Sequence, residues 1–276
     1  MSAAPSAAYS SASPAASAFD RVATSYDELF TRTAIGRAQR RQVWSRLLAG
    51  FHRGDRILEL NCGTGEDARF LAQHGVSVLA CDASAAMIDV AASYSVVAEP
   101  AGFIEYRQLA NEKLFRLSPR IPFDGAFSNF SGLNCVADLQ PVARNLAALV
   151  RPGARVLICL WSRVCLAEVL WFVVRGEAKK AFRRFPGRAT ARLGDSSISV
   201  SYPTIASVRR AFAPWFRLET RRAIGLFVPP SYAEPWVREN TSKLAWLEKL
   251  DRAFSAWPGL RDAGDHVLLE FVRCPR

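Results

Sequence analysis

The stretch Ile57-Leu-Glu-Leu-Asn-Cys-Gly-Thr-Gly-Glu66 decides the fold. Residues 56–60 form a short apolar run, which is typical of a buried strand. Gly63 and Gly65 follow, and a residue without a Cβ lets the backbone turn sharply and approach a ligand. A helix expected at 66–73 would then present free N–H groups to an anion. The stretch therefore predicts a strand, a ligand-binding loop and a helix in succession.

Asp82 stands at the end of the next expected strand, 76–81, a position 23 residues beyond Glu59. An acidic side chain there can accept hydrogen bonds from both ribose hydroxyls of a nucleoside. The alternative is that Asp82 only caps a helix expected at 84–93, for which Ser84 is also a plausible N-cap. The order of strand, loop, helix, strand and acid favours the nucleoside site.

The same alternation continues along the chain. Further strands are expected at 103–109, 123–128 and 155–160, and further helices at 34–48 and 137–150. Strands that alternate with helices indicate βαβ units and a parallel sheet. The fold class is therefore α/β, with a doubly wound sheet and a ligand crevice at the carboxyl ends of the strands.

Composition limits the other classes of protein. Half of the 276 residues are hydrophobic, so a sizeable core is expected. The six cysteines form no Cys-x-x-Cys pair and have no histidine cluster, so no metal site is expected and a reducing, cytoplasmic compartment fits. Residues 1–18 are almost entirely Ala, Ser and Pro and are expected to be a disordered tail before a single domain, 19–276. No apolar run reaches the length of about 20 residues that a membrane span needs.

The alternation lapses after Arg163. We expect a cap inserted at about 164–215, and beyond it a return to sheet patterning. The segments expected here are helices at 164–184, 204–212 and 241–255, a hairpin of 189–192 with 197–202, and strands at 216–228 and 266–272.

The positive charge is concentrated in this later part. The chain has a formal net charge of +11, of which +9 lies beyond residue 162. We interpret the basic residues of the cap as substrate-binding groups for an anionic acceptor, or as a contact with a membrane surface. A solvated basic face is the alternative. The residues singled out are Lys179, Lys180, Arg183 and Arg184.

The run Glu59–Gly65, with Cys81-Asp-Ala-Ser84 and Met87 after it, resembles the first two motifs of class I S-adenosylmethionine-dependent methyltransferases. Residues 19–27 resemble the N-terminal signature of the branch that contains quinone-biosynthesis and many small-molecule methyltransferases. Residues 149–153 resemble the turn before the fifth strand, and residues 265–271 the terminal antiparallel strand. The resemblance implies a Rossmann-like, mostly parallel, seven-stranded sheet whose last strand is antiparallel.

The resemblance also implies S-adenosyl-L-methionine as the cofactor and gives roles to matched positions. Tyr26 would close over the cofactor, Glu59 and the following loop would hold its methionine end, and Asp82 would hold the ribose. The full set of implied cofactor-binding residues is Tyr26, Glu59, Asn61, Cys62, Gly63, Gly65, Asp82, Ala83, Met87, Ala110, Asn111, Asn129 and Phe130.

Two positions depart from the family pattern. Asn61 stands where the first glycine of the loop is usual, although Asn adopts positive φ more readily than most residues. Leu109-Ala110-Asn111-Glu112 stands where an acidic residue often precedes the adenine contact. The motif at 128–134 is not the Asn-Pro-Pro-Tyr type that is used on amino groups of bases, which argues against that class of nucleic-acid methyltransferase.

No catalytic dyad is visible, and methyl transfer from a sulfonium often needs only an acceptor placed in line. His266, at the start of the last expected strand, is the one candidate base, with a structural histidine as the alternative. We therefore predict methyl transfer to a small-molecule or lipid-like acceptor, with nucleic acid disfavoured. The alternatives are a tRNA or rRNA methyltransferase and a catalytically inactive cofactor-binding protein. An NAD-dependent dehydrogenase is disfavoured because the loop lacks the full Gly-x-Gly-x-x-Gly pattern.

Overall fold

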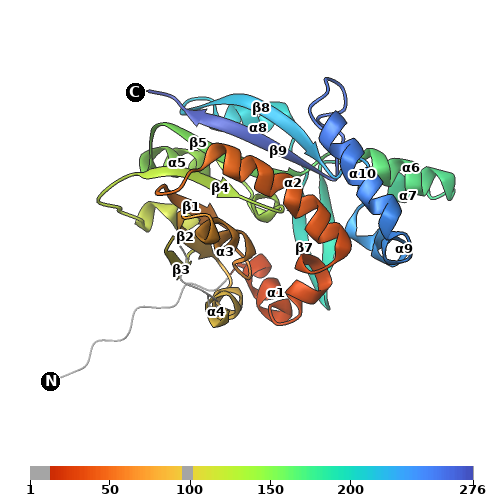
Figure 1. Ribbon diagram of the computed structural model, residues 1–276, viewed down its shortest axis with the longest axis horizontal. Coiled ribbons are helices and arrows are strands. Elements are labelled where there is room, and N and C mark those ends of the chain that lie inside the picture. Colours follow the sequence, from red (N-terminus) through yellow and green to blue (C-terminus); the bar gives the residue numbers. More distant parts are fainter. Residues whose placement is uncertain (1–12, 95–101, 276) are drawn as a thin grey trace.

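A computed structural model describes residues 13–94 and 102–275, and its centre is a seven-stranded sheet with the order β3-β2-β1-β4-β5-β9-β8 (Figure 1). The expected α/β class and the mostly parallel sheet are confirmed. The strands are β1 Arg56–Leu60, β2 Ser77–Asp82, β3 Ile104–Gln108, β4 Phe123–Ser128, β5 Val150–Trp161, β8 Phe216–Ile224 and β9 His266–Arg273.

The first five strands pair in parallel, and β9 runs antiparallel to both β5 and β8. Helices connect the parallel strands, because a parallel pair needs a crossover of a dozen or more residues. Ser84 caps α4 through its side chain, as expected, and Gly65 begins α3 with a positive φ of 78°. The helices between or beside these strands are α2 Ala34–Gly50, α3 Glu66–Gln73, α4 Ala85–Ser93 and α5 Leu139–Leu149, with a 3-10 turn at Asn111–Arg116.

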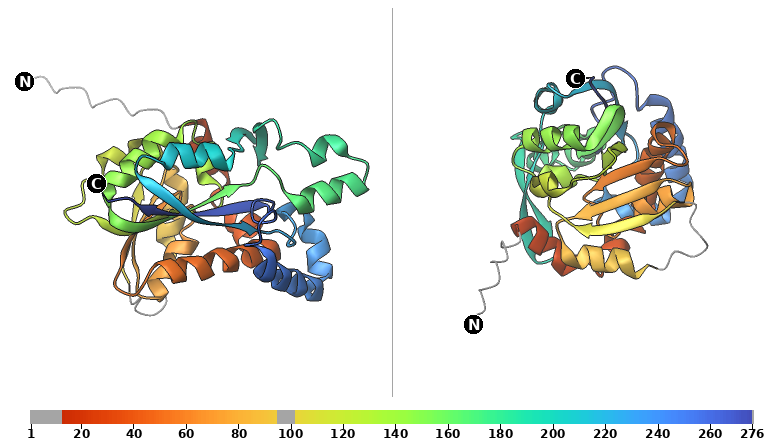
Figure 2. Two further views of the ribbon diagram at one scale, coloured as in Figure 1. Left: turned by 90° about the horizontal axis from the view of Figure 1, so that it is seen from above. Right: turned by 90° about the vertical axis from the view of Figure 1, so that its left-hand side faces the viewer.

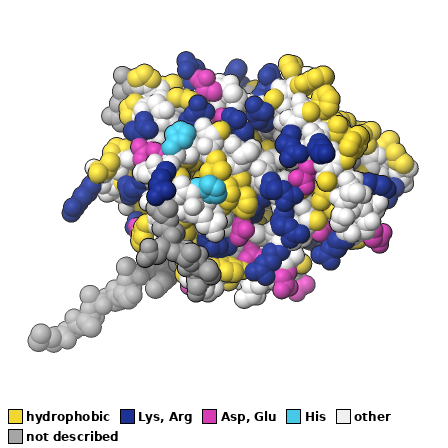
Figure 3. Space-filling model, in the orientation of Figure 1, with side chains coloured by type: hydrophobic (Ala, Val, Ile, Leu, Met, Phe, Trp, Pro, Cys, Tyr) yellow, Lys and Arg dark blue, Asp and Glu magenta, His cyan; other side chains and the backbone are white. Residues whose placement is uncertain are grey.

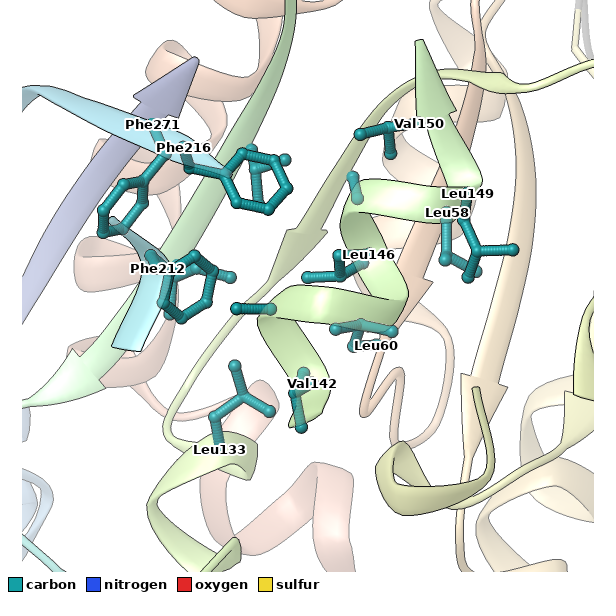
Figure 4. Close-up of a cluster of buried hydrophobic side chains, with 14 of the residues drawn as sticks. Leu58, Leu60, Leu133, Val142, Leu146, Leu149, Val150, Phe212, Phe216 and Phe271 are labelled. Atoms are coloured by element: carbon teal, nitrogen blue, oxygen red, sulfur yellow. The ribbon is translucent and has the colours of Figure 1, made fainter. Parts of the chain in front are cut away.

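Helices cover both faces of the sheet, α5 and α8 (Ile205–Phe212) on one and α2 on the other (Figure 2). Figure 4 shows Val142 and Leu146 of α5 packed between Leu58 and Leu60 of β1 and a phenylalanine group, Phe212, Phe216 and Phe271. Burying the sheet on both faces explains why its inner strands are nearly continuous hydrophobic runs. This packing holds the carboxyl ends of β1, β2 and β4 side by side at one edge of the sheet.

The N-terminal expectation needs a correction. Residues 13–18 were expected in a disordered tail, yet Ser13 caps a helix, α1 Pro14–Val22, and Ala16 and Ala18 are buried. Pro at the first turn and Ser before it favour a helix start, and small Ala side chains let α1 pack against α4 and β7. The composition of residues 13–18, taken alone, gave no indication of this helix. The rest of the expected tail, 1–12, lies outside the described residues.

The stretch from 164 to 215 divides into two parts. Residues 164–202, here named the inserted segment, contain α6 Leu166–Val174, α7 Ala178–Ala181 and a separate two-stranded sheet of β6 Arg188–Leu193 and β7 Ser196–Ser201. The single helix expected at 164–184 is wrong, because α6 ends before Gly176, which has a φ of 73°. Helix α8 instead belongs to the main core through Val208 and Phe212. A cap role for the inserted segment stays a prediction.

The C-terminal part adds helices on the α2 side of the sheet. The strand expected at 216–228 ends earlier, at Ile224, and α10 Thr241–Phe254 agrees with its expected bounds to within one residue. A short helix, α9 Glu234–Glu239, was not expected from the sequence. Its Glu234 accepts hydrogen bonds from the backbone N–H groups of Ala34 and Ile35, so α9 anchors the start of α2. The remaining turns are a π-helix at Asp27–Thr31 and 3-10 turns at Gly132–Cys135 and Ser231–Ala233.

Candidate functional site

A cleft of about 860 Å³, open to solvent, lies at the carboxyl ends of β1, β2 and β4. The N-terminal segment forms its outer wall through Phe19 and Tyr26. Ten of the residues expected to bind a cofactor line this cleft: Tyr26, Asn61, Cys62, Gly63, Asp82, Ala83, Met87, Asn111, Asn129 and Phe130. Glu59, Gly65 and Ala110 do not line it, so the structure brings most of the expected set together.

The loop after β1 keeps its turn despite the missing first glycine. Asn61 has a φ of 57°, in the left-handed region that Asn tolerates. Its side-chain amide donates to Ser128 Oγ at 2.9 Å, and its Oδ1 accepts a hydrogen bond from Asn111 Nδ2 at 2.7 Å. Asn61 therefore ties the loop to the ends of β4 and β3. A Cβ at Gly63 would meet no atom within 4 Å, so the loop backbone faces open space there.

Asp82 is held by backbone donors at the floor of the cleft. Its Oδ2 accepts from Gly63 N and its Oδ1 from Ser84 N, both at 2.9 Å. Burial raises the pKa of Asp82 above its usual value, against the effect of these N–H donors. Each oxygen keeps a second lone pair, and Ser84 Oγ itself accepts from Met87 N and caps α4. Capping therefore does not account for Asp82, whose carboxylate faces the cleft with acceptor capacity to spare.

Glu59 lies behind the loop rather than in the cleft wall. Its side chain is 1% exposed, and among the described residues its Oε2 has no hydrogen-bond partner. Burial, and then repulsion from Asp67, raise the pKa of Glu59 well above its usual value. A buried, unpartnered carboxyl oxygen is costly unless something satisfies it. Glu59 Oε2 thus keeps an acceptor position that none of the described residues satisfies.

A buried cluster of hydrogen-bonded side chains, centred on Asp67, lies beside Glu59. The sequence did not indicate it. Asp67, in the first turn of α3, is 4% exposed and accepts hydrogen bonds from Trp44 Nε1 at 2.6 Å and Asn129 Nδ2 at 2.9 Å. Arg40 of α2 pairs with the same carboxylate at 2.7 Å, and its guanidinium lies 4.7 Å from the centre of the Phe130 ring. Arg40 lines the cleft. In the sequence these are ordinary polar residues of two helices, and no motif marks them.

The chain after β4 is strained where it borders the cleft. Phe130 and Ser131 have φ values of 43° and 70°, which cost about 1–3 kcal/mol each for residues other than glycine. Asn129 holds this turn, because its Oδ1 accepts from Phe130 N and its Nδ2 binds Asp67. Strain of this kind persists when surrounding contacts fix it. The result is that Phe130 presents its ring to the cleft and to Arg40.

The N-terminal segment is fastened over the cleft by two carboxylates. Asp20 accepts hydrogen bonds from Ser84 Oγ at 2.6 Å and Ala86 N at 3.2 Å. Asp27 accepts from Thr64 Oγ1 at 2.6 Å and from the Tyr94 hydroxyl. These bonds join the segment to the loops after β1 and β2. Residues 19–27 therefore act as a wall of the site rather than as a free arm.

His266 lies near the cleft but does not line it. Its ring is 5% exposed and meets Phe130 edge-on at 5.3 Å between ring centres. Burial lowers the pKa of His266 to about 4, so the ring is neutral at physiological pH. Within the described residues its Nδ1 has no hydrogen-bond partner and lies 3.5 Å from Asp265 Oδ2. Phe130, which contacts this ring, lines the cleft, whereas His266 does not.

None of the four basic residues expected to bind substrate lines the cleft. Arg183 forms two hydrogen bonds to the carboxylate of buried Glu168, at 2.8 and 2.9 Å. Arg184 is 5% exposed and pairs with both Glu168 and Asp265 at 2.7 Å. Lys179 and Lys180 are exposed, and Lys180 pairs with Glu177. Two of the four charges are therefore paired with the buried Glu168, and of these two arginines only Arg184 is itself buried. The described residues also contain no cluster of His, Cys, Asp and Glu that could hold a metal ion.

Comparisons with known proteins fit this site. Residues 58–156 match the family model of a methyltransferase domain. The chain is 32% identical over 146 residues to the 2-phytyl-1,4-naphtoquinone methyltransferase of Synechococcus elongatus, covering 51% of this chain and 60% of the relative. It is 31% identical over 170 residues to the malonyl-[acyl-carrier protein] O-methyltransferase of Serratia marcescens, covering 59% of each. The matches thus span about 60% of the length of these curated relatives.

Solved structures share the fold. An S-adenosylmethionine dependent methyltransferase from Mesorhizobium loti aligns with a TM-score of 0.55 and 18% identity, covering 87% of this chain and 100% of that one. The DhpI–SAH complex aligns with a TM-score of 0.56 and 19% identity, covering 95% and 97%. The fold expected from the resemblance is therefore confirmed.

Proposed function

We propose that this chain, a class I methyltransferase by its domain match and its fold, binds S-adenosyl-L-methionine and transfers the methyl group to a small-molecule or lipid-like acceptor. The observation that carries the proposal is the contact between Asp82 and the N–H of Gly63, at the floor of an open cleft. An acid with spare acceptor capacity beside a glycine loop suits a nucleoside with a charged tail.

The residues at the two ends of the cleft fit the two ends of this cofactor. Asp82 would accept hydrogen bonds from the ribose hydroxyls, with Ala83, Met87 and Asn111 beside the adenine. At the other end, Arg40 has an Nε without a partner among the described residues, and we assign it the carboxylate of the methionine group. The unpartnered Glu59 Oε2 would accept from the amino group. The orphaned donor and acceptor thus have the charges that an amino acid needs.

Neighbouring residues would complete the binding site through their backbone and shape. Gly65 begins α3, and a Cβ there would lie 2.6 Å from the Tyr106 hydroxyl, so only glycine fits. Cys62 lines the cleft beside the loop. Tyr26 would close the outer wall, and Asn129 and Phe130 would line the space around the transferred group. Ala110 lies outside the cleft wall and keeps only a backbone role in this proposal.

Methyl transfer from this cofactor requires little direct chemical participation by these side chains. When bound, the cofactor supplies an electrophilic methyl on a sulfonium, and the protein must place the acceptor in line with it and exclude water. Phe130, held by its strained turn, gives a fixed apolar wall for that purpose. His266 stays a candidate base for a hydroxyl acceptor, but Phe130 would have to move to expose it.

The proposed acceptor is a lipid-like or anionic small molecule. The relatives' names include a phytyl naphthoquinone, which is lipid-like, and a malonyl group on acyl-carrier protein, which carries a carboxylate. Of the four basic residues expected to bind substrate, only Lys179 and Lys180 still offer charge to such an acceptor, because Arg183 and Arg184 bind Glu168. A cytoplasmic location is part of the proposal and agrees with six cysteines that form no disulfide.

Calorimetry tests the cofactor first. The purified chain should bind S-adenosylmethionine and S-adenosylhomocysteine and should show no comparable affinity for NAD. Absence of binding of the first two at millimolar concentration would refute the proposal. Turnover is tested separately, with a labelled methyl donor and a metabolite extract. Cofactor binding without any labelled product from lipid, small-molecule or RNA fractions would instead favour a catalytically inactive binding protein.

A further inference from the structure

One end of the molecule carries an apolar surface that the cleft does not use. Helix α6 lies there beside α9 and α10 (Figure 1), and the three border a shallow apolar groove together with the chain after β8. Figure 3 shows hydrophobic side chains gathered at this end. We name this surface the apolar face and define it by Leu170, Trp171, Val174, Phe227, Trp236 and Leu247.

Packing against the hydrophobic core does not by itself explain why helix α6 is so apolar. Its sequence, Leu-Ala-Glu-Val-Leu-Trp-Phe-Val-Val, is apolar on every side except at Glu168. A helix of that kind is normally buried all round. Here Leu170 is 56% exposed and Val174 is 85% exposed. Contiguous exposed apolar side chains of this sort mark an interaction surface.

Cations border the aromatic side chains of the face. The Arg175 guanidinium lies 3.7 Å from the Trp171 ring centre, and Lys243 Nζ lies 5.6 Å from that of Trp236. Lys180 Nζ lies 5.6 Å from the neighbouring Phe172 ring. Tryptophan beside exposed Lys and Arg is the combination that sits at a boundary between hydrocarbon and water. Lys180 is paired with Glu177, so the positive charge of the rim comes from Arg175 and Lys243, around an apolar centre.

The support beneath the face is fixed. Asp251 of α10 is buried and accepts from Phe227 N at 2.6 Å and from Gln42 Nε2 at 2.8 Å. On the other side, Leu166 N donates to Ala263 O at 2.8 Å at the start of α6. The apolar side chains therefore stand on anchored elements, so the face needs no rearrangement before it meets a partner.

From these observations we propose that the apolar face binds the surface of a lipid bilayer that carries anionic headgroups. Val174 is strongly exposed and the groove is shallow. This shape fits the broad apolar interior of a bilayer better than it fits a single extended chain. A twofold contact between two copies would bring the positive rims together, which is unfavourable. Anionic headgroups complement the Lys and Arg side chains of the rim.

The contact would be peripheral. Among the described residues no helix has the length and apolarity to cross a bilayer. Helix α6 would lie in the headgroup region with its apolar side chains directed into the lipid. The proposal does not rest on methyl transfer, because the face is separate from the cleft.

Sedimentation of the full chain with vesicles tests the proposal without cofactor or acceptor. Vesicles of phosphatidylcholine with phosphatidylglycerol should carry the protein down, and phosphatidylcholine alone should bind at least about tenfold more weakly. Val174→Glu with Leu170→Glu should weaken binding by about tenfold or more. The matched control is Ile121→Glu, at a 72% exposed apolar residue before β4, and it should bind like the unchanged chain.

Charge is tested by a second pair of variants. Arg175→Gln with Lys243→Gln should weaken binding to the anionic vesicles about tenfold, and added salt should do the same. Arg209→Gln with Arg210→Gln removes two exposed charges from α8 and should have little effect. The proposal is overturned if the unchanged chain ignores anionic vesicles, or if the control and test variants bind alike. It is also overturned if light scattering shows a dimer that Val174→Glu dissociates, because the face would then join two copies.

Discussion

The cleft region, from β1 to β5, and the inserted segment, 164–202, both carry charged residues but use them in opposite ways. Asp82 lines the cleft with acceptor capacity to spare, and Glu59, buried behind the loop, has an Oε2 without a partner among the described residues. In the inserted segment, Glu168 binds Arg183 and Arg184 and leaves little of their charge for a partner. The first region holds groups that are ready for a ligand, and the second holds groups that satisfy one another.

The difference shows that basic residues that cluster in the sequence do not all contribute positive charge to the surface of the folded protein. Arg184 also donates to the carbonyl oxygens of Ser162 and Asp265, so nearly all of its hydrogen-bonding capacity is used inside the protein. Burying ions costs free energy that only good pairing offsets. Arg184 therefore attaches the inserted segment to the start of β9, whereas Arg183 pairs within the segment.

The largest expected effect comes from breaking that attachment. Arg184→Met should lower the free energy of unfolding by about 3–5 kcal/mol, because it leaves Asp265 buried without its main cation. Urea denaturation measures the loss. Arg188→Met, at an exposed arginine of the same segment, should change stability by less than about 0.5 kcal/mol. Equal effects of the two variants would show that the buried pairing is not what holds the segment.

A somewhat smaller effect should appear with pH at His266. Its pKa falls from 6.5 to about 4 on folding. The unfolded chain therefore binds the proton more readily between these values, and stability that is present above pH 6.5 is lost as the pH falls toward 4. The loss amounts to at most about 3 kcal/mol.

Thermal unfolding between pH 4 and pH 7 measures this dependence. His266→Gln should flatten the slope relative to the unchanged chain, whereas His74→Gln, at an exposed histidine, should not. Parallel slopes for all three proteins would show that His266 is not a buried neutral ring. The result bears on the comparison, since His266 contacts Phe130 of the cleft wall and its pKa is also influenced by Arg184 of the inserted segment.

The smallest of the three effects on free energy concerns the cleft itself. Asp82→Ala should weaken binding of S-adenosylhomocysteine by about 1.5–3 kcal/mol, through loss of a charged acceptor for the ribose hydroxyls. The fold should survive, because Ser84 still caps α4. Asp89→Ala, at an exposed acid of the same helix, is the control for calorimetry. Unchanged affinity together with a collapse of thermal stability would make Asp82 a structural residue only.

Most strands and helices of the first half could be predicted from the sequence, because each is coded by neighbouring residues. β1, α3 and β4 have the bounds that their apolar runs and turn residues indicate. The misses share a physical cause. The first part of helix α1, residues 14–18, contains only Pro, Ala and Ser, a composition that indicates disorder, and the helix is held by packing on α4 and by the Asp20 contact with Ser84. The break in the helix at Gly176 depends on how α6 and α7 fold back together.

The sequence by itself determined the strand, the glycine loop, the helix and the acid at the next strand end, since backbone conformation and hydrophobic period are local properties. Only the tertiary structure decided which charges remain open. Arg40 meets Asp67 from another helix, and Arg184 meets Asp265 across 81 positions of the chain. Such pairs form because packing removes water around both partners at once, and no local pattern records which distant residue will share that space.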